Sequence, residues 1–185
     1  MTRSLAFALS MAGVLIPALW LQAAHSDTSA VPGQMFPQLS GQTLTGKSVE
    51  LPAATTGKPA VVIVSFSKTA GKDARSWNER LSRDFPKDVP SYTIILLESV
   101  PKLFRGLAVS SIKGSMPVPI QDRTIILYSD EKLWKQRVAF SEASRAYVIL
   151  LGPDGRIRWS SKEAFTEPSY AQMKDQLDRL LRPHS

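Results

Sequence analysis

The feature that most constrains this chain is the run of residues 60–66, which reads AVVIVSF. A run of β-branched apolar residues without polar alternation is typical of a strand that is covered on both faces. Residues 92–97 form a second apolar run of the same type. Between them, apolar residues recur at helical spacing, which predicts an amphipathic helix over 70–85. Strand, helix and strand in this order predict a right-handed parallel crossover and therefore an α/β fold.

The last third of the chain predicts a hairpin followed by a helix. Residues 146–151 and 156–160 are two strand segments joined by the tight turn Pro153-Asp154-Gly155. A final helix is expected over about 168–181, because its apolar residues fall on one face. We expect the hairpin to join the parallel pair in one central sheet, with both helices packed against it.

Two further segments are expected to pair with this sheet. Residues 36–40 and 47–51 flank a turn region at 41–46 and predict a small hairpin or two short edge segments. Residues 124–128 predict a strand.

The middle of the chain is expected to be less regular. Leu103 and Leu107 indicate a short helix, but glycines and prolines predict irregular structure up to Pro119. A helix then begins near residue 130, with Ser129 or Asp130 as its N-cap.

The composition excludes several classes of enzyme. The 185 residues include no cysteine, and the only two histidines are His25 and His184. The chain therefore has no disulfide, no Cys/His zinc site, no Ser-His-Asp arrangement and no imidazole base within the domain. The acidic residues are scattered and form no metal-binding loop. We expect neither a metal nor a cofactor.

The charge favours anionic partners. The chain has 23 Lys and Arg against 16 Asp and Glu, for a formal net charge of +7. No basic stripe interleaved with aromatic residues is present, so nucleic acid is not an expected partner. An anionic membrane surface is the better candidate.

The N-terminus predicts export. Arg3 is followed by an apolar, uncharged segment from Leu5 to Leu21. Residues 1–26 are therefore interpreted as a cleaved signal peptide or a retained membrane anchor. Residues 27–35 are expected to be a linker and residues 36–182 the folded domain. The prediction is an extracytoplasmic protein, in the periplasm, either secreted or tethered to the inner membrane.

The order of these elements, with the string YVILLGPDGRIRW over 147–159, resembles the thioredoxin superfamily and its peroxiredoxin and TlpA-like branches. The resemblance implies a three-layer sandwich around a central mixed sheet. Those enzymes carry a reactive cysteine just after the first buried strand, at the start of the next helix. Thr69 and Lys72 occupy those positions here, and the loop that carries a cis-proline in redox members reads Ser144-Arg145-Ala146. The resemblance thus implies the fold without the redox chemistry.

A closer resemblance is to the mitochondrial ATP synthase assembly factor "ATP-ten" family and its bacterial relatives. The segments that carry it are Phe36-Pro37, Gly46-Lys47, Leu103-Phe104-Arg105, Arg145-Ala146-Tyr147-Val148, Gly155-Arg156-Ile157-Arg158-Trp159 and Glu163-Ala164. That family lacks an essential redox pair, associates with the inner membrane and acts as a chaperone for a membrane-sector subunit. The resemblance implies a non-catalytic assembly factor or chaperone that binds a polypeptide of a membrane complex.

The first group of candidate partner-binding residues is the helix start at Thr69 and Lys72. Free N–H groups there can receive a carboxylate, a phosphate or a peptide carbonyl, or Thr69 or Ser67 can simply cap the helix. Arg145, from the resembling segment, is a further candidate. Two alternatives use this helix start: a thiol-independent oxidoreductase and a small-ligand binding module.

The second group is Arg156 and Arg158. Strand alternation places them on one face of the hairpin and Ile157 and Trp159 on the other. The arginines can bind carboxylates of a partner or lipid phosphates, or they can pair within the chain with Glu163 or Asp154.

Overall fold

The computed structural model describes residues 30–85 and 89–182. The predicted leader, residues 1–26, and the first residues of the predicted linker lie outside the described residues. Within them, seven strands form one sheet in the order β2-β1-β5-β4-β3-β6-β7. The strands are β1 Leu39–Thr43, β2 Ser48–Leu51, β3 Ala60–Ser65, β4 Ser91–Leu96, β5 Thr124–Leu127, β6 Tyr147–Leu151 and β7 Ile157–Ser161. The helices are α1 Lys68–Asp84, α2 Lys102–Gly114, α3 Val118–Gln121, α4 Glu131–Arg137 and α5 Glu167–Leu181, with a short 3-10 turn at Ala53–Thr55.

Strand β3 lies in the middle of the molecule, and all six of its residues are buried. It pairs in parallel with β4, where Val62 is opposite Tyr92, and antiparallel with β6, where Val62 is opposite Ile149. Strands β6 and β7 form the predicted hairpin. The α/β fold, the parallel pair and the hairpin are therefore confirmed, and the sheet is mixed.

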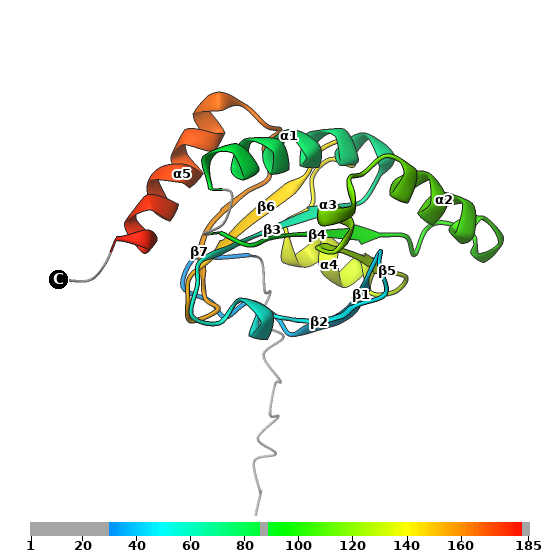
Figure 1. Ribbon diagram of the computed structural model, residues 1–185, viewed down its shortest axis with the longest axis horizontal. Coiled ribbons are helices and arrows are strands. Elements are labelled where there is room, and N and C mark those ends of the chain that lie inside the picture. The colour runs from blue at the N-terminus through cyan, green and yellow to red at the C-terminus, as the bar shows by residue number, and fades with distance from the viewer. Residues whose placement is uncertain (1–29, 86–88, 183–185) are drawn as a thin grey trace, which may run out of the picture.

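The sheet is the middle of three layers (Figure 1). On one face, the side chains of Val61 and Ile63 pack with Trp77 of α1 and Met173 of α5. On the other face, Val62 and its neighbours pack with Trp134 of α4. Because successive strand residues point to opposite faces, one apolar run supplies both cores.

Residues 30–35, which belong to the predicted linker, lie along the edge strand β7. The N–H of Gly33 donates to the carbonyl of Ile157 at 2.7 Å, and the N–H of Ile157 donates to Gln34 at 2.8 Å. The hydroxyl of Ser160 donates to the carbonyl of Ala30 at 2.7 Å. This segment satisfies backbone groups that an edge strand would otherwise expose.

The predicted alternation along β7 was wrong. Ile157 packs in the cluster that contains Trp134, whereas Trp159 packs against the opposite cluster that contains Trp77. The cause is a β-bulge: Leu150 pairs with Trp159 and Leu151 pairs with Ile157, so that Arg158 is the extra residue. A single inserted residue reverses the face of every side chain beyond it.

The middle of the chain is more helical than the sequence predicted. Helix α2 has 13 residues and continues through Gly106 to Gly114. One internal glycine costs a helix only about 1 kcal/mol, which the helix formers around it tolerate. Helix α4 begins as predicted after Asp130, but the Asp130 side chain does not cap it. Instead, the Glu98 carboxylate accepts the N–H of Glu131 at 2.6 Å.

Gly41 of β1 makes room for a core side chain, which yields a prediction. A Cβ atom at Gly41 would lie 2.5 Å from Cγ2 of Ile125, a fully buried residue of β5. Gly41→Ala should therefore lower the free energy of unfolding by about 1–3 kcal/mol. Gly71→Ala is the matched control, because no atom lies within 4 Å of a Cβ there. In helix α1 it should raise stability by roughly 0.5–1 kcal/mol. Denaturant titration measures both, and a neutral Gly41→Ala would contradict this packing.

Candidate functional site

The structure divides the predicted partner-binding residues between the two opposite ends of the central strands. Thr69 follows the carboxyl end of β3, and Arg145 precedes β6, which runs antiparallel to β3. Arg156 and Arg158 lie at the other end of β6, Arg156 just before β7 and Arg158 within β7 beside the last residues of β6. At roughly 3.3 Å per residue, the five-residue strand β6 separates the two groups by about 16 Å. One small ligand therefore cannot contact both groups.

At the carboxyl end of β3, Ser67 is the N-cap of α1. Its hydroxyl accepts the N–H of Ala70 at 3.1 Å and donates to the carbonyl of Ala143. Of the two predicted caps, Ser67 is therefore the one used. Thr69 and Lys72 are exposed on the first turns of the helix.

Asp73 is a structural residue that the sequence analysis missed. Its carboxylate accepts the N–H of Ala146 at 2.8 Å and the N–H of Phe165 at 2.7 Å. One side chain of α1 thus holds both the loop before β6 and the loop before α5. Nothing in the sequence near Asp73 marks it, because its partners are 73 and 92 residues away.

Arg145 lies in the loop that Asp73 holds and forms two ion pairs. Its guanidinium is 2.9 Å from the Glu142 carboxylate and 3.2 Å from the Glu163 carboxylate. Glu163, one of the two partners that the sequence predicts for Arg156 and Arg158, pairs with Arg145 instead. Two carboxylates therefore neutralise Arg145, which leaves it less free to bind a partner than its sequence position suggested.

At the opposite end of β6, Arg156 and Arg158 both approach Asp154 of the turn. The Asp154 carboxylate lies 2.7 Å from Arg158 and 3.8 Å from Arg156. Arg156 also donates to the carbonyl of Gly33 at 2.9 Å. A Cβ atom at Gly152 would lie 2.6 Å from Nε of Arg158, so the glycine makes room for this ion pair. Both arginines remain solvent-accessible.

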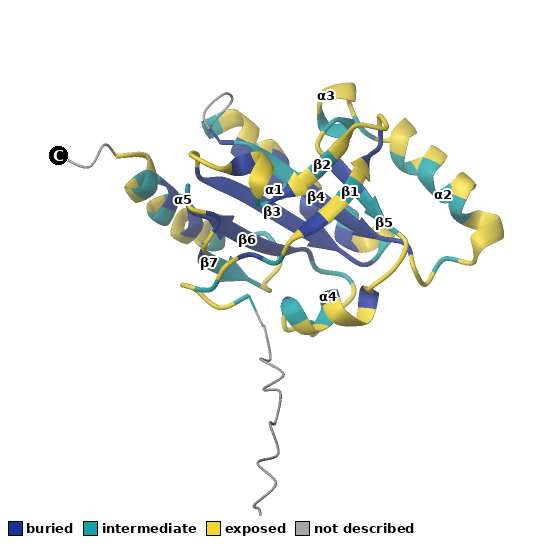
Figure 2. Ribbon diagram, turned by 90° about the horizontal axis from the view of Figure 1, so that it is seen from below, coloured by how far each residue is buried: buried dark blue, intermediate teal, exposed yellow. Residues whose placement is uncertain are grey.

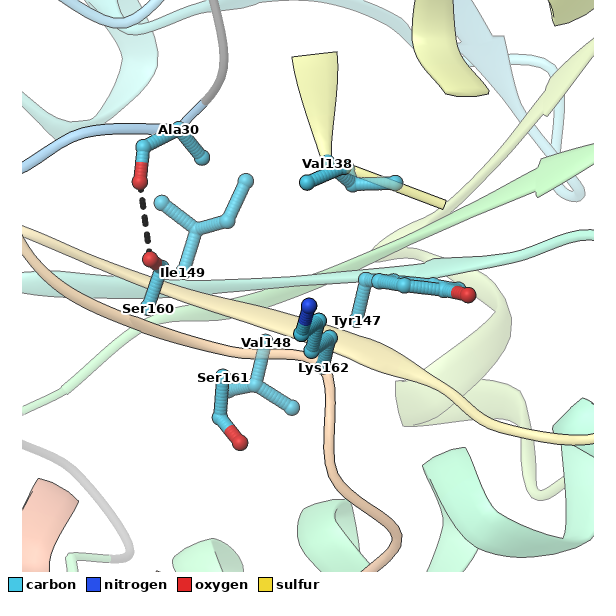
Figure 3. A pocket seen from close by; sticks show the side chains of 9 residues that line it. Ala30, Val138, Tyr147, Val148, Ile149, Ser160, Ser161 and Lys162 are labelled. Carbon is cyan, nitrogen blue, oxygen red and sulfur yellow. Dashed lines mark hydrogen bonds between the residues drawn. The ribbon is translucent and has the colours of Figure 1, made fainter. Parts of the chain in front are cut away.

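A cavity of about 240 Å³ lies beside β6 and β7 (Figure 3). On one side of it Ser160 bonds to Ala30, and on the other lie Val138 and Tyr147. The Tyr147 hydroxyl accepts two backbone N–H groups at 2.9 Å and donates to the carbonyl of Glu142. Because the hydroxyls of Ser160 and Tyr147 are already bonded, the polar side chains that the cavity leaves for a ligand are those of Ser161 and Lys162, which also line it.

Two groups with displaced pKa values hold helices in place. Burial raises the pKa of Tyr170 on α5 far above its ordinary value, and the hydrogen bond to Asp84 on α1 adds to the effect. Burial also acts to raise the pKa of Glu131. Hydrogen bonds from Lys135 and from the N–H of Ser99 outweigh burial and lower that pKa. Neither group belongs to the predicted partner-binding set.

A third surface, which the sequence analysis did not single out, is helix α2. None of its residues is buried, and its ribbon extends from the body of the molecule beyond β5 (Figure 2). The outward apolar residues are Leu103, Phe104 and Leu107. The sequence signal for this surface is the pair Leu103 and Leu107, four positions apart between Lys102 and Lys113, in a stretch that has no acidic residue from 99 to 121.

The chemistry open to these surfaces is limited. The sequence contains no cysteine, so the chain cannot carry out thiol–disulfide exchange. Across residues 30–85 and 89–182, no cluster of three or more His, Cys, Asp or Glu side chains is arranged to hold a metal ion. In the same residues, no helix combines the length and the apolarity that crossing a bilayer requires.

The role of Asp73 can be tested by stability. Asp73→Ala leaves the fully buried N–H of Ala146 without a partner, at a cost of about 1–3 kcal/mol. Asp73→Asn should cost less, because its amide oxygen keeps one acceptor. Lys72→Ala, one residue away and exposed, should stay within about 0.5 kcal/mol of the parent. If denaturant titration gave equal midpoints for Asp73→Ala and Lys72→Ala, the carboxylate would not hold the loops.

Solved structures of thioredoxin-like proteins share this fold. A thiol:disulfide interchange protein DsbE from Chlorobium tepidum superposes with a TM-score of 0.59 at 13% identity, over 83% of this chain and 100% of that one. The thioredoxin domain of a thiol-disulfide oxidoreductase from Bacteroides vulgatus gives 0.58 at 19% identity, over 80% and 99%. BsSco, of the Sco family of cytochrome c oxidase assembly proteins, gives 0.57 at 14% identity, over 82% and 98%. The fold is therefore thioredoxin-like, as predicted.

Comparison of sequences is more specific. No curated protein matches the sequence of this chain. The family model of the ATP10 protein matches residues 29–180, which include the whole sheet and nearly all of α5. The match contains the Arg145 loop, the Arg156–Arg158 hairpin and helix α2. This thioredoxin-like, cysteine-free chain therefore belongs to the ATP10 family.

Proposed function

We propose that this protein is a non-catalytic assembly factor for the ATP synthase, which binds a polypeptide subunit outside the cytoplasm. The observation that carries the proposal is the match of the ATP10 family model to residues 29–180. The match covers every strand of the sheet, so the similarity to the family extends over the whole sheet.

The structure around α1 supports binding over catalysis. The position that carries thiol chemistry in thioredoxin-like enzymes holds Thr69 and Lys72, both exposed. The hydroxyl of Ser67 is taken up by the helix cap and by Ala143, and the carboxylate of Asp73 by two backbone N–H groups. The polar groups that a catalytic site would use are thus engaged in holding loops.

The hairpin arginines are the proposed contact with the partner. Arg156 and Arg158 bring two positive charges to one carboxylate, Asp154, so that the group keeps a net positive charge. Their exposed guanidinium groups have donors left for the carboxylates or carbonyls of a partner.

Affinity capture tests the proposed partner. The full chain, captured from detergent-solubilised membranes of its native host, should retain ATP synthase subunits. Arg156→Gln with Arg158→Gln should reduce that capture at least tenfold, because charge-assisted hydrogen bonds each contribute about 1.5–3 kcal/mol. The thermal midpoint should stay nearly unchanged, because both side chains are partly exposed.

The matched control removes two positive charges at the start of α1, at the opposite end of the central strands. Lys68→Gln with Lys72→Gln should leave the capture of subunits intact. If only this second variant lost the partner, the start of α1 would be the contact surface. If the wild-type chain retained a different complex and no ATP synthase subunit, the assembly function would be wrong.

The proposed location has its own test. Arg3 followed by the uncharged run from Leu5 to Leu21 directs export. A reporter that is active only in the cytoplasm, fused after Ser185, should therefore give background activity in a bacterial host. The same fusion without residues 1–26 should be fully active. Strong activity from the complete chain would contradict an extracytoplasmic location.

A further inference from the structure

The outward face of helix α2 is apolar and uncovered. Leu103 is 84% exposed, Leu107 is 70% exposed and Phe104 is 53% exposed. The three side chains fall within about 100° of one another around the helix axis, because successive residues are 100° apart. An exposed apolar stripe of this kind marks an interaction surface.

The base of α2 is firmly attached, so the stripe is presented and does not fold back. Glu98 accepts the N–H of Glu131 at 2.6 Å, and the Glu131 carboxylate accepts the N–H of Ser99 at 3.2 Å. Arg105 donates to the carbonyls of Glu98 and Val100, and its guanidinium lies 5.0 Å from the ring centre of Tyr128. These contacts hold the first turns of the helix.

Beyond its base, α2 stands away from the sheet. An open groove of about 330 Å³ separates it from the β1–β2 turn, and Val109 and Lys113 line this groove from the helix. In Figure 1, α2 is accordingly the helix that extends farthest from the layered body at the β5 side. The outward stripe is therefore accessible to a broad, flat partner.

Every charged residue within helix α2 is basic. Residues 99–121 contain Lys102, Arg105 and Lys113 and no acidic residue. Lys102 and Lys113 are exposed and eleven positions apart, which places them about 20° apart around the helix axis, roughly 80–100° from Leu103 and on the side where Lys113 lines the groove. Lysines beside an apolar stripe can extend their ammonium groups toward phosphates while their stems remain on apolar surface.

We propose that α2 is an interfacial helix that lies on an anionic lipid bilayer. Its leucines and phenylalanine enter the boundary between headgroups and acyl chains, and its lysines contact the lipid phosphates. The charged residues of α2 are all basic, which favours an anionic bilayer over an apolar groove of a protein. An apolar groove would not select for charges of a single sign on the helix. This inference concerns a surface distinct from the hairpin and does not depend on the proposed function.

The absence of cysteine makes a direct test possible. A single Leu107→Cys substitution, labelled with an environment-sensitive fluorophore, reports on α2 alone within the full chain. Leu133→Cys on α4, where the leucine is 41% exposed, is the matched control. With phosphatidylglycerol vesicles, the label at 107 should shift to the blue and brighten several-fold, and the label at 133 should not. The comparison separates α2 from any attachment through residues 1–26.

Charge and salt then test the lysines. Adding Lys102→Gln and Lys113→Gln should weaken the vesicle dependence of the label at 107 by about 25-fold, since each lysine contributes about fivefold near an anionic surface. Vesicles of phosphatidylcholine should give a much weaker response. An unchanged label at 107 on vesicles that carry the protein would overturn the proposal. So would a response without vesicles, which indicates self-association, or a response only when a membrane protein is present.

Discussion

The structure depends on the burial of β3 on both faces. A six-residue strand without a polar side needs a hydrogen-bonded neighbour at each edge and a helix layer over each face. Strands β4 and β6 are the hydrogen-bonded neighbours of β3, α1 and α5 cover one face, and α4 covers the other. Each buried apolar side chain contributes roughly 1.5–3 kcal/mol, so this one strand accounts for a large part of the driving force.

The burial of β3 also determines what lies at its carboxyl end. In thioredoxin-like enzymes the start of the following helix is a reactive site, because the helix dipole lowers the pKa of a thiol there. Here the same place carries Ser67 and Asp73, whose oxygens bond to backbone groups of two other loops, the one before β6 and the one before α5. The positive end of α1 thus stabilises loop structure through a cap and a carboxylate.

The separation of the surfaces has a functional consequence. The hairpin with Arg156 and Arg158 and the start of α1 lie at opposite ends of β6, and α2 projects beyond β5, across the sheet from the hairpin. A protein with these surfaces can contact a polypeptide at one edge while another part rests on a second partner. The rigid central sheet fixes the distance between the contacts, which a flexible linker would not do.

The sequence by itself determined β3, β4, the β6–β7 hairpin, α1 and α5, because each has a periodicity that can be read within a few residues. It also excluded thiol chemistry, since no cysteine is present. Only the tertiary structure showed that Asp73 holds two loops, that Glu163 neutralises Arg145 and that Glu98 supplies the cap of α4. It also decided which apolar residues stay uncovered: Leu107 and Leu81 look alike in sequence, yet one is exposed and the other buried. The reason is that burial and pairing depend on groups far away along the chain, which local patterns do not encode.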